Sequence, residues 1–165
     1  MLKGELVELV PVTEAHVPDL RRILHTPQVH ARWGDADDEP GWPLEDPEVV
    51  CFAVLVDGDV RGMIQYGEEE DPGYRNASLD IFLDAEVHGR GVGEDTVRTL
   101  ARFLVEERGH HRLVIDPAAD NAAAIRCYEK VGFRPVGIMR RYERDTDGQG
   151  WHDGLLMDLL ADELT

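Results

Sequence analysis

The sequence contains a glycine-rich turn whose residue types suggest that it binds an anion. It runs His88-Gly89-Arg90-Gly91-Val92-Gly93 and leads into a segment with helical periodicity. Glycine permits a tight turn and a close approach of other groups to the backbone, and the first N–H groups of a helix attract phosphate. We therefore expect the backbone amides of residues 90–94 to bind a pyrophosphate, although turns of this kind also occur without a ligand.

A second segment, residues 121–133, has the form of a short helix that carries an asparagine and a tyrosine. Asn121 stands at its start, Tyr128 lies two turns further on, and Gly132 is a helix stop. A phenol with a pKa near 10 is able to give a proton to a leaving group of similar basicity. Two plainer interpretations stay open, with Asn121 as a simple helix cap and Tyr128 as a core residue.

Several aspartates stand where an apolar or neutral residue is more usual. Asp80 interrupts the apolar run Ala77–Leu83, and Asp116 ends a second apolar run. Asp71 lies in a loop and Asp153 on the last expected strand. A carboxylate binds a cationic amine through a charge-assisted hydrogen bond and can accept its proton. We expect Asp80 and Asp116 to contact a cationic substrate, although exposure on an alternating strand also explains Asp80.

The net charge of −17 is unevenly distributed along the chain. Residues 90–142 carry ten basic and seven acidic side chains, a balance of +3, whereas the rest carries −20. This asymmetry predicts an anionic cofactor on the mildly basic part and a cationic substrate on the acidic part, although acids also serve solubility alone. It argues against a nucleic-acid partner. Because no apolar run spans a membrane and no signal peptide is visible, we expect no membrane association and a cytoplasmic location.

The cysteines and histidines do not indicate a disulfide or a metal site. Cys51 and Cys127 are too few and too far apart for a disulfide framework, and buried packing is the better interpretation of both. The seven histidines form no set with metal-ligand spacing. We therefore expect no metal cofactor.

The hydrophobic pattern places these residues on strands and helices in a defined order. Residues 25–48 show no clear pattern, and the length suits a single domain over residues 1–165. Helices are expected to begin at Thr13, near Val92 and at Asn121. The expected strands are Leu2–Val10, Val49–Val56, Val60–Tyr66, Ala77–Leu83, Arg112–Asp116, Arg134–Tyr142 and Trp151–Leu159.

The glycine turn and the helix that carries Asn121 and Tyr128, each preceded by a strand, together resemble the core of the GNAT N-acetyltransferase superfamily. The order of the expected elements is also that of the GNAT fold. The resemblance implies an α/β (α+β) fold with a central mixed, mostly antiparallel sheet that is splayed at the acetyl-CoA site and flanked by helices. It further implies acetyl-CoA as the co-substrate and direct attack by an amine in a ternary complex.

The resemblance also implies roles for individual residues. In the family, the strand before the glycine turn runs along the pantetheine arm, and the helix tyrosine gives a proton to the coenzyme A sulfur, a role that falls on Tyr128. The family usually has Gln or Arg where this chain has His88, so no side-chain role is assigned there. The expected cofactor-binding residues are Ile81, Phe82, Leu83, Gly89, Arg90, Gly91, Val92, Gly93, Glu94, Asn121 and Tyr128.

A narrower resemblance links the chain to the aminoglycoside 6'-N-acetyltransferases. It is carried by Asp71-Pro72-Gly73-x-Arg75, by Asp80, by Asp116-Pro117 and by residues 124–133. In that group, the aspartates that match Asp80 and Asp116 bind ammonium groups of the antibiotic, and the Asp80 position is proposed to help deprotonate the 6'-amine. The resemblance implies antibiotic resistance as a role, Tyr128 and Asp80 as catalytic residues, and a substrate site formed by Trp33, Asp71, Asp80, Asp116 and Asp153.

Two alternatives stay open. The same chemistry could act on a protein N-terminus, a lysine or a siderophore-type amine. The chain could also be a non-enzymatic acyl-CoA-binding module, against which Tyr128 and Asp80 argue. A monomer and a homodimer both fit the sequence.

Overall fold

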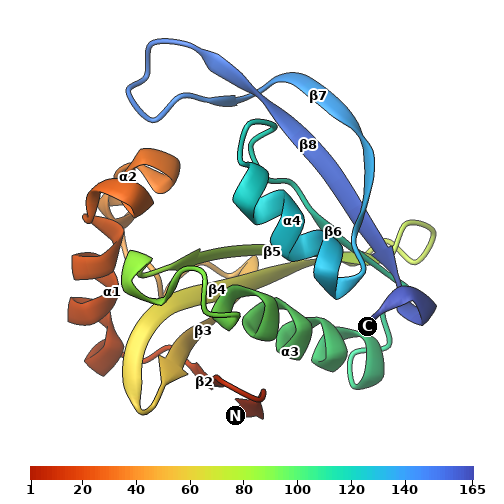
Figure 1. Ribbon diagram of the computed structural model, residues 1–165, viewed down its shortest axis with the longest axis horizontal. Helices are drawn as coiled ribbons and strands as arrows, with labels where there is room; N and C mark the ends of the chain where they lie inside the picture. Colours follow the sequence, from red (N-terminus) through yellow and green to blue (C-terminus); the bar gives the residue numbers. More distant parts are fainter.

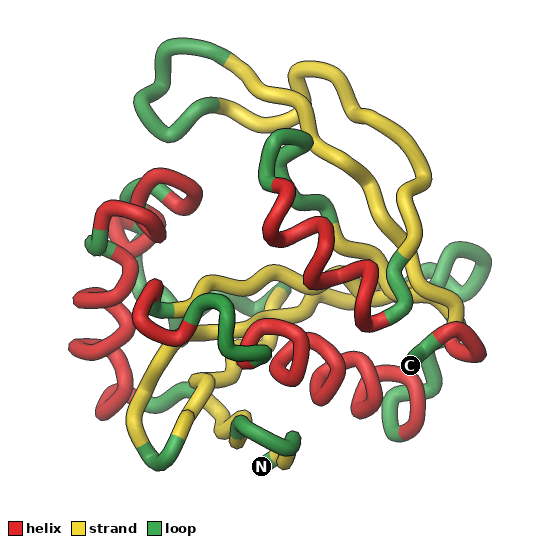
Figure 2. Tube along the Cα trace, viewed as in Figure 1, coloured by secondary structure: helices red, strands yellow, loops and turns green.

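The computed structural model describes residues 1–165 as one eight-stranded sheet with four α-helices (Figures 1 and 2). The strands lie in the order β1-β2-β3-β4-β5-β6-β8-β7, and every neighbouring pair is antiparallel except β5 and β6. The strands are β1 (Leu2–Lys3), β2 (Glu8–Pro11), β3 (Val49–Val56), β4 (Asp59–Glu69), β5 (Asn76–Leu83), β6 (Arg112–Ile115), β7 (Arg134–Arg144) and β8 (Trp151–Leu160). The helices are α1 (Val17–Leu24), α2 (Pro27–Trp33), α3 (Val92–Glu106) and α4 (Ala122–Val131).

The sheet splits between β5 and β6. These parallel strands pair only at Ala77 with Leu113 and at Ser78 with Val114, although β5 continues to Leu83. Figure 1 shows the β7–β8 hairpin rising away from β3, β4 and β5, with α4 in the space between the two parts. The expected splay of the sheet is therefore confirmed, and it exposes one backbone edge of β5.

Two apolar clusters cover opposite faces of the sheet. The larger includes Leu79 of β5 and packs under α3 and α4, whereas the smaller includes Phe82 and packs against α1 and α2. Since successive side chains of a strand point to opposite faces, β5 contributes to both clusters. Its even-numbered residues, Asp80 among them, face the side of α1 and α2.

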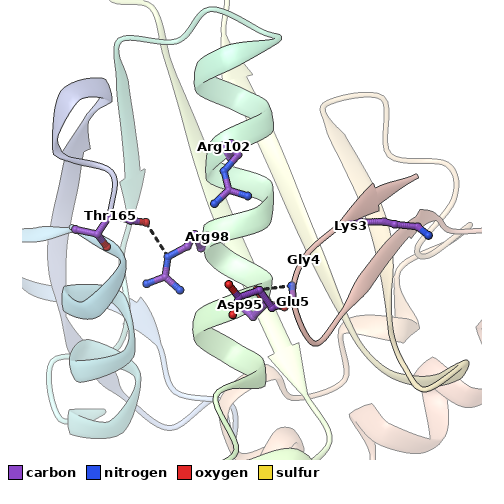
Figure 3. Close-up of a pocket in the computed structure, with 7 residues that line it drawn as sticks. All are labelled: Lys3, Gly4, Glu5, Asp95, Arg98, Arg102 and Thr165. Carbon is purple, nitrogen blue, oxygen red and sulfur yellow. Dashed lines mark hydrogen bonds between the residues drawn. The ribbon is translucent and has the colours of Figure 1, made fainter.

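The N-terminal segment differs from the single strand that was expected over Leu2–Val10. It forms the two short strands β1 and β2, because a turn closes with a bond from Gly4 N–H to the Val7 carbonyl. The carboxylate of Asp95 on α3 accepts the N–H groups of Glu5, Leu6 and Val7 at 2.7–3.1 Å. This buried acceptor, distant in the sequence, fixes the turn. Figure 3 shows Asp95 pointing at it from α3, with Arg98 on the same helix reaching the Thr165 carbonyl.

The segment 25–48 is more regular than its sequence pattern suggests. Thr26 and Pro27 start α2, and Gly34, with φ of 62°, ends it. A short 3₁₀ helix, η2 (Ala36–Asp38), follows. The prediction of an irregular segment was wrong here, because a seven-residue helix is too short to show a clear apolar period. The other expected helices and strands are confirmed, with ends that differ by up to four residues.

Two further observations bear on composition. No helix combines the length and the apolar character that crossing a membrane requires. Cys51 and Cys127 are both half-buried and unpaired, and burial raises the pKa of each thiol to about 11. Both thiols are therefore neutral at physiological pH, as expected for packing residues.

Candidate active site

The glycine turn presents a row of free backbone donors at the start of α3. Gly91 is the N-cap in a left-handed conformation with φ of 80°, and Gly89 has φ of 75°. The N–H groups of residues 90–94 have no acceptor in the chain, and the first backbone bond of the helix runs from Asp95 N–H to the Gly91 carbonyl. Unpaired N–H groups at a helix N-terminus form an anion site. This geometry fits a pyrophosphate, and no other residue satisfies these donors.

The free edge of β5 leads to that turn. Beyond Ser78, no strand pairs with the edge of β5 that faces β6, so a thin, extended ligand is able to pair there. The side chains of Ile81 and Leu83 pack against the larger apolar cluster. His88 Nε2 lies 3.0 Å from the Leu83 carbonyl and so ties the end of β5 to the turn. This contact gives His88 a structural role that the sequence did not indicate.

Tyr128 lies on α4 at the inner side of the split. Its side chain is buried and packs edge-on against Phe133, with ring centroids 6.3 Å apart. Burial, and then the charge of Asp80, raise the pKa of Tyr128 well above its usual value. The raised pKa keeps the phenol protonated. Because its hydroxyl forms no hydrogen bond within the chain, that proton is available to a ligand.

Asp80 and Asp116 stand at equivalent positions on the two diverging strands. The last β5–β6 pair is Ser78 with Val114, and each aspartate comes two residues later, Asp80 within β5 and Asp116 directly after the end of β6. Because side chains alternate with a period of two, both carboxylates start from the same face of the sheet, where the strands part. The structure therefore brings these two predicted residues together.

The environment of Asp80 makes its carboxyl a base for neutral pH. Water reaches the side chain from the open split, yet surrounding protein atoms desolvate it and raise its pKa from 3.8 to about 7. The charges of Asp116 and Glu143 raise it further, whereas a 3.0 Å bond from the Ile81 N–H opposes the shift. A carboxyl with a pKa near the working pH is suited to proton transfer.

Two residues of β7 complete this acidic group, and the sequence did not indicate either. The hydroxyl of Tyr142 donates to Asp116 Oδ2 at 2.5 Å, a bond that raises the pKa of Tyr142 to about 12. Glu143 lies close enough to affect the pKa of Asp80 and pairs with His152 at 3.1 Å. No local signal could identify them, because β7 is separated from β6 in the sheet by the intervening strand β8.

Asn121 and Trp33 take the places that local structure gives them. Asn121 is the N-cap of α4, and its Oδ1 accepts the Ala124 N–H at 3.3 Å, which leaves its side-chain NH₂ free. Trp33, at the end of α2, packs edge-on against Phe82 with ring centroids 5.0 Å apart. Trp33 therefore lines the same face of β5 as Asp80.

Asp71 lies apart from the Asp80–Asp116 pair, whereas Asp153 lies on β8 and contacts the β7 backbone beside Tyr142. Asp71 lies in the β4–β5 loop, at the opposite end of β5 from Leu83, where its Oδ1 accepts the Gly73 N–H at 2.8 Å. Asp153 lines a cavity of about 680 Å³ with Arg140 and Arg141, and its Oδ1 accepts the Arg141 N–H.

Comparisons with known proteins agree with this geometry. The model of the acetyltransferase (GNAT) family matches residues 13–133. An aminoglycoside N(6')-acetyltransferase type 1 of Klebsiella pneumoniae is 39% identical over 157 residues, which cover 82% of this chain and 78% of that protein. A ribosomal protein bS18-alanine N-acetyltransferase of Escherichia coli K12 is 36% identical over 84 residues, 49% of this chain and 53% of that protein. A crystal structure of aminoglycoside acetyltransferase AAC(6')-Ib with coenzyme A superposes with a TM-score of 0.77 at 25% identity, covering 95% and 96% of the two chains.

Proposed function

As a member of the GNAT acetyltransferase family, this chain is an acetyl-CoA-dependent N-acetyltransferase, and we propose that it acetylates a primary amine of a compact polycation. The 6'-amine of an aminoglycoside is the first candidate. The Klebsiella relative, matched over most of both chains, supports this choice by its name. The observation that carries the proposal is the pair of carboxylates, Asp80 and Asp116, where the sheet opens.

The residues that would bind acetyl-CoA lie along the free edge of β5 and at the start of α3. The free amides of residues 90–94 would hold its pyrophosphate, and the unpaired edge of β5 at residues 81–83 would hold its pantetheine arm. Asn121, with a free side-chain NH₂, would contact the same arm. When bound, acetyl-CoA supplies the activated acetyl thioester.

The acidic group suits an acceptor that carries more than one ammonium. Asp80, Asp116 and Glu143 bring three carboxylates into one electrostatic group. Asp116 Oδ1 has no partner in the chain, since Tyr142 bonds only Oδ2. A charge-assisted bond to each ammonium contributes roughly 1.5–3 kcal/mol. A single charged amine would use only one of these carboxylates, so a polycation gains more from the site.

The chain supplies a proton acceptor, Asp80, and a proton donor, Tyr128, close enough for the charge of one to affect the pKa of the other. Asp80 accepts the proton that the acceptor amine must lose before it attacks, directly or through one water. Tyr128 holds a proton on its hydroxyl for the departing sulfur. The base must be able to ionise near neutral pH, and the pKa of Asp80 allows this. The acid must keep its proton at that pH, and the raised pKa of Tyr128 ensures it.

An amine screen tests the acceptor. Release of free thiol from acetyl-CoA is measured with a kanamycin-type aminoglycoside that bears a 6'-amine, and with a matched analogue that bears a 6'-hydroxyl instead. Spermidine and a peptide with an N-terminal alanine complete the set. We expect turnover with the 6'-amine and at least a hundredfold less with its analogue. Turnover of the peptide alone would refute the polycation proposal and leave the acetyltransferase activity intact.

A further inference from the structure

Two histidines and two aspartates converge at the corner between α1 and α2, outside the active site described above. His25 caps the C-terminal end of α1, and His30 lies on α2. Their rings stack with centroids 5.8 Å apart. Gly34 turns the chain so that Asp35 and Asp37, at the start of η2, return to these rings. We name this group the α1–α2 corner cluster.

The ligand atoms of the cluster are close enough to share one ion. One nitrogen of His25, one nitrogen of His30 and one carboxylate oxygen of Asp35 all lie within 4.8 Å of one another. Bonds of about 2.0–2.1 Å to a tetrahedral metal require ligand separations of about 3.4 Å. The His30 Nε2–Asp35 Oδ1 separation is already 2.9 Å. All three side chains are 42–59% exposed and are able to make the remaining adjustment by rotation.

Asp37 provides an independent indication of a cation. Its side chain is only 11% exposed, and its Oδ1 is buried without a hydrogen-bond partner. An unsatisfied buried carboxylate oxygen destabilises the protein, and a nearby cation would offset that cost. Oδ2 lies 2.9 Å from His25 Nε2 and 3.8 Å from Arg21 Nε. Asp37 can therefore hold the His25 ring from behind while Nδ1, which has no partner in the chain, binds the metal.

The surrounding charges and the types of donor atom restrict which metal ions the cluster could bind. The segment from residue 35 to residue 48 carries seven acidic and no basic side chains, which favours cations, whereas Arg21 beside Asp37 opposes them. Two imidazoles with one carboxylate favour Zn²⁺, Co²⁺ or Ni²⁺, whereas Mg²⁺ and Ca²⁺ prefer oxygen alone. His152 offers a contrast, because Asp145 and Glu143 bind its two different ring nitrogens and so cannot share one ion with it.

We propose that the α1–α2 corner cluster binds one divalent transition-metal ion through His25, His30 and Asp35, with Asp37 as the outer partner of His25. Three protein ligands leave a position for water. The ion ties the end of α1 to α2, the helix that carries Trp33 against Phe82. The spacing of the histidines in the sequence does not indicate the site, because Asp35 reaches them only through the turn at Gly34.

Metal binding to the tag-free, metal-stripped protein tests the proposal without any measurement of activity. Titration with Co²⁺ is followed by its visible absorption, and Zn²⁺ affinity is measured by competition with a chromophoric chelator. We expect one ion per chain and the intense absorption of a tetrahedral Co²⁺ site. His25→Gln, His30→Gln and Asp35→Asn should each weaken Zn²⁺ binding at least tenfold, and Asp37→Asn should weaken it about 10- to 100-fold.

His111→Gln is the matched control, because His111 is exposed and its side chain forms no hydrogen bond in the chain. It should bind Zn²⁺ as the wild type does. Thermal unfolding provides a second readout: Zn²⁺ should raise the Tm of the wild type and of His111→Gln, but not that of the double variant H25Q/H30Q. The proposal is overturned if the wild type binds no stoichiometric Co²⁺, or if H25Q/H30Q keeps wild-type affinity.

Discussion

Replacing Asp80 by Asn should remove most of the activity and stabilise the protein at alkaline pH. The folded chain raises the pKa of Asp80 from 3.8 to about 7. Between these values the folded state binds more protons than the unfolded state, so this carboxyl lowers stability as pH rises through that window. The full shift corresponds to about 4 kcal/mol. Because water reaches Asp80 from the open split, we expect about 1–2 kcal/mol of this cost to remain.

Urea unfolding at pH 8 and at pH 5 measures the effect. Asp80→Asn should be more stable than the wild type at pH 8, and the difference should shrink at pH 5, where the wild-type carboxyl is protonated. Wild-type kcat should rise with pH through about 7, and Asn should lower kcat about 10²- to 10⁴-fold. Asp71→Asn, at the far end of β5, should change neither property. An Asp80→Asn variant that is no more stable than the wild type at pH 8 would refute the electrostatic reasoning.

Three further predictions test other parts of the site. Tyr128→Phe should lower kcat about 10- to 1000-fold with little change in Tm, because its hydroxyl bonds nothing in the chain; an unchanged kcat would leave Tyr128 as packing alone. Gly91→Val should raise the KM for acetyl-CoA at least tenfold, since φ of 80° strains a branched residue. Gly58→Val carries the same strain at φ of 85° in an open turn and should not raise that KM. Asp116→Asn should raise the acceptor KM about tenfold or more, and the increase should be larger at low salt. Tyr142→Phe should raise the acceptor KM by a smaller factor. Loss of acetyl-CoA binding in both variants would contradict the assignment of these residues to the acceptor.

The sequence by itself identified the features that depend on neighbouring residues. A left-handed N-cap at Gly91, a side-chain cap at Asn121 and a helix end at Gly132 are local conformations, and residue type decides them within a few positions. The strands from β3 to β8 followed from apolar runs and turn residues for the same reason. These local signals, in their order along the chain, were sufficient for the GNAT fold and for the cofactor turn.

Only the tertiary structure decided how the acceptor side is assembled. Asp80 and Asp116 meet because β5 and β6 pair in one register for two residues and then part. Tyr142 and Glu143 reach them from β7, which is separated from β6 by β8 in the sheet. Asp71, equally acidic and near Asp80 in sequence, is carried to the other end of β5. Register and strand order arise from contacts between segments far apart in the chain, so no local pattern of residues encodes them.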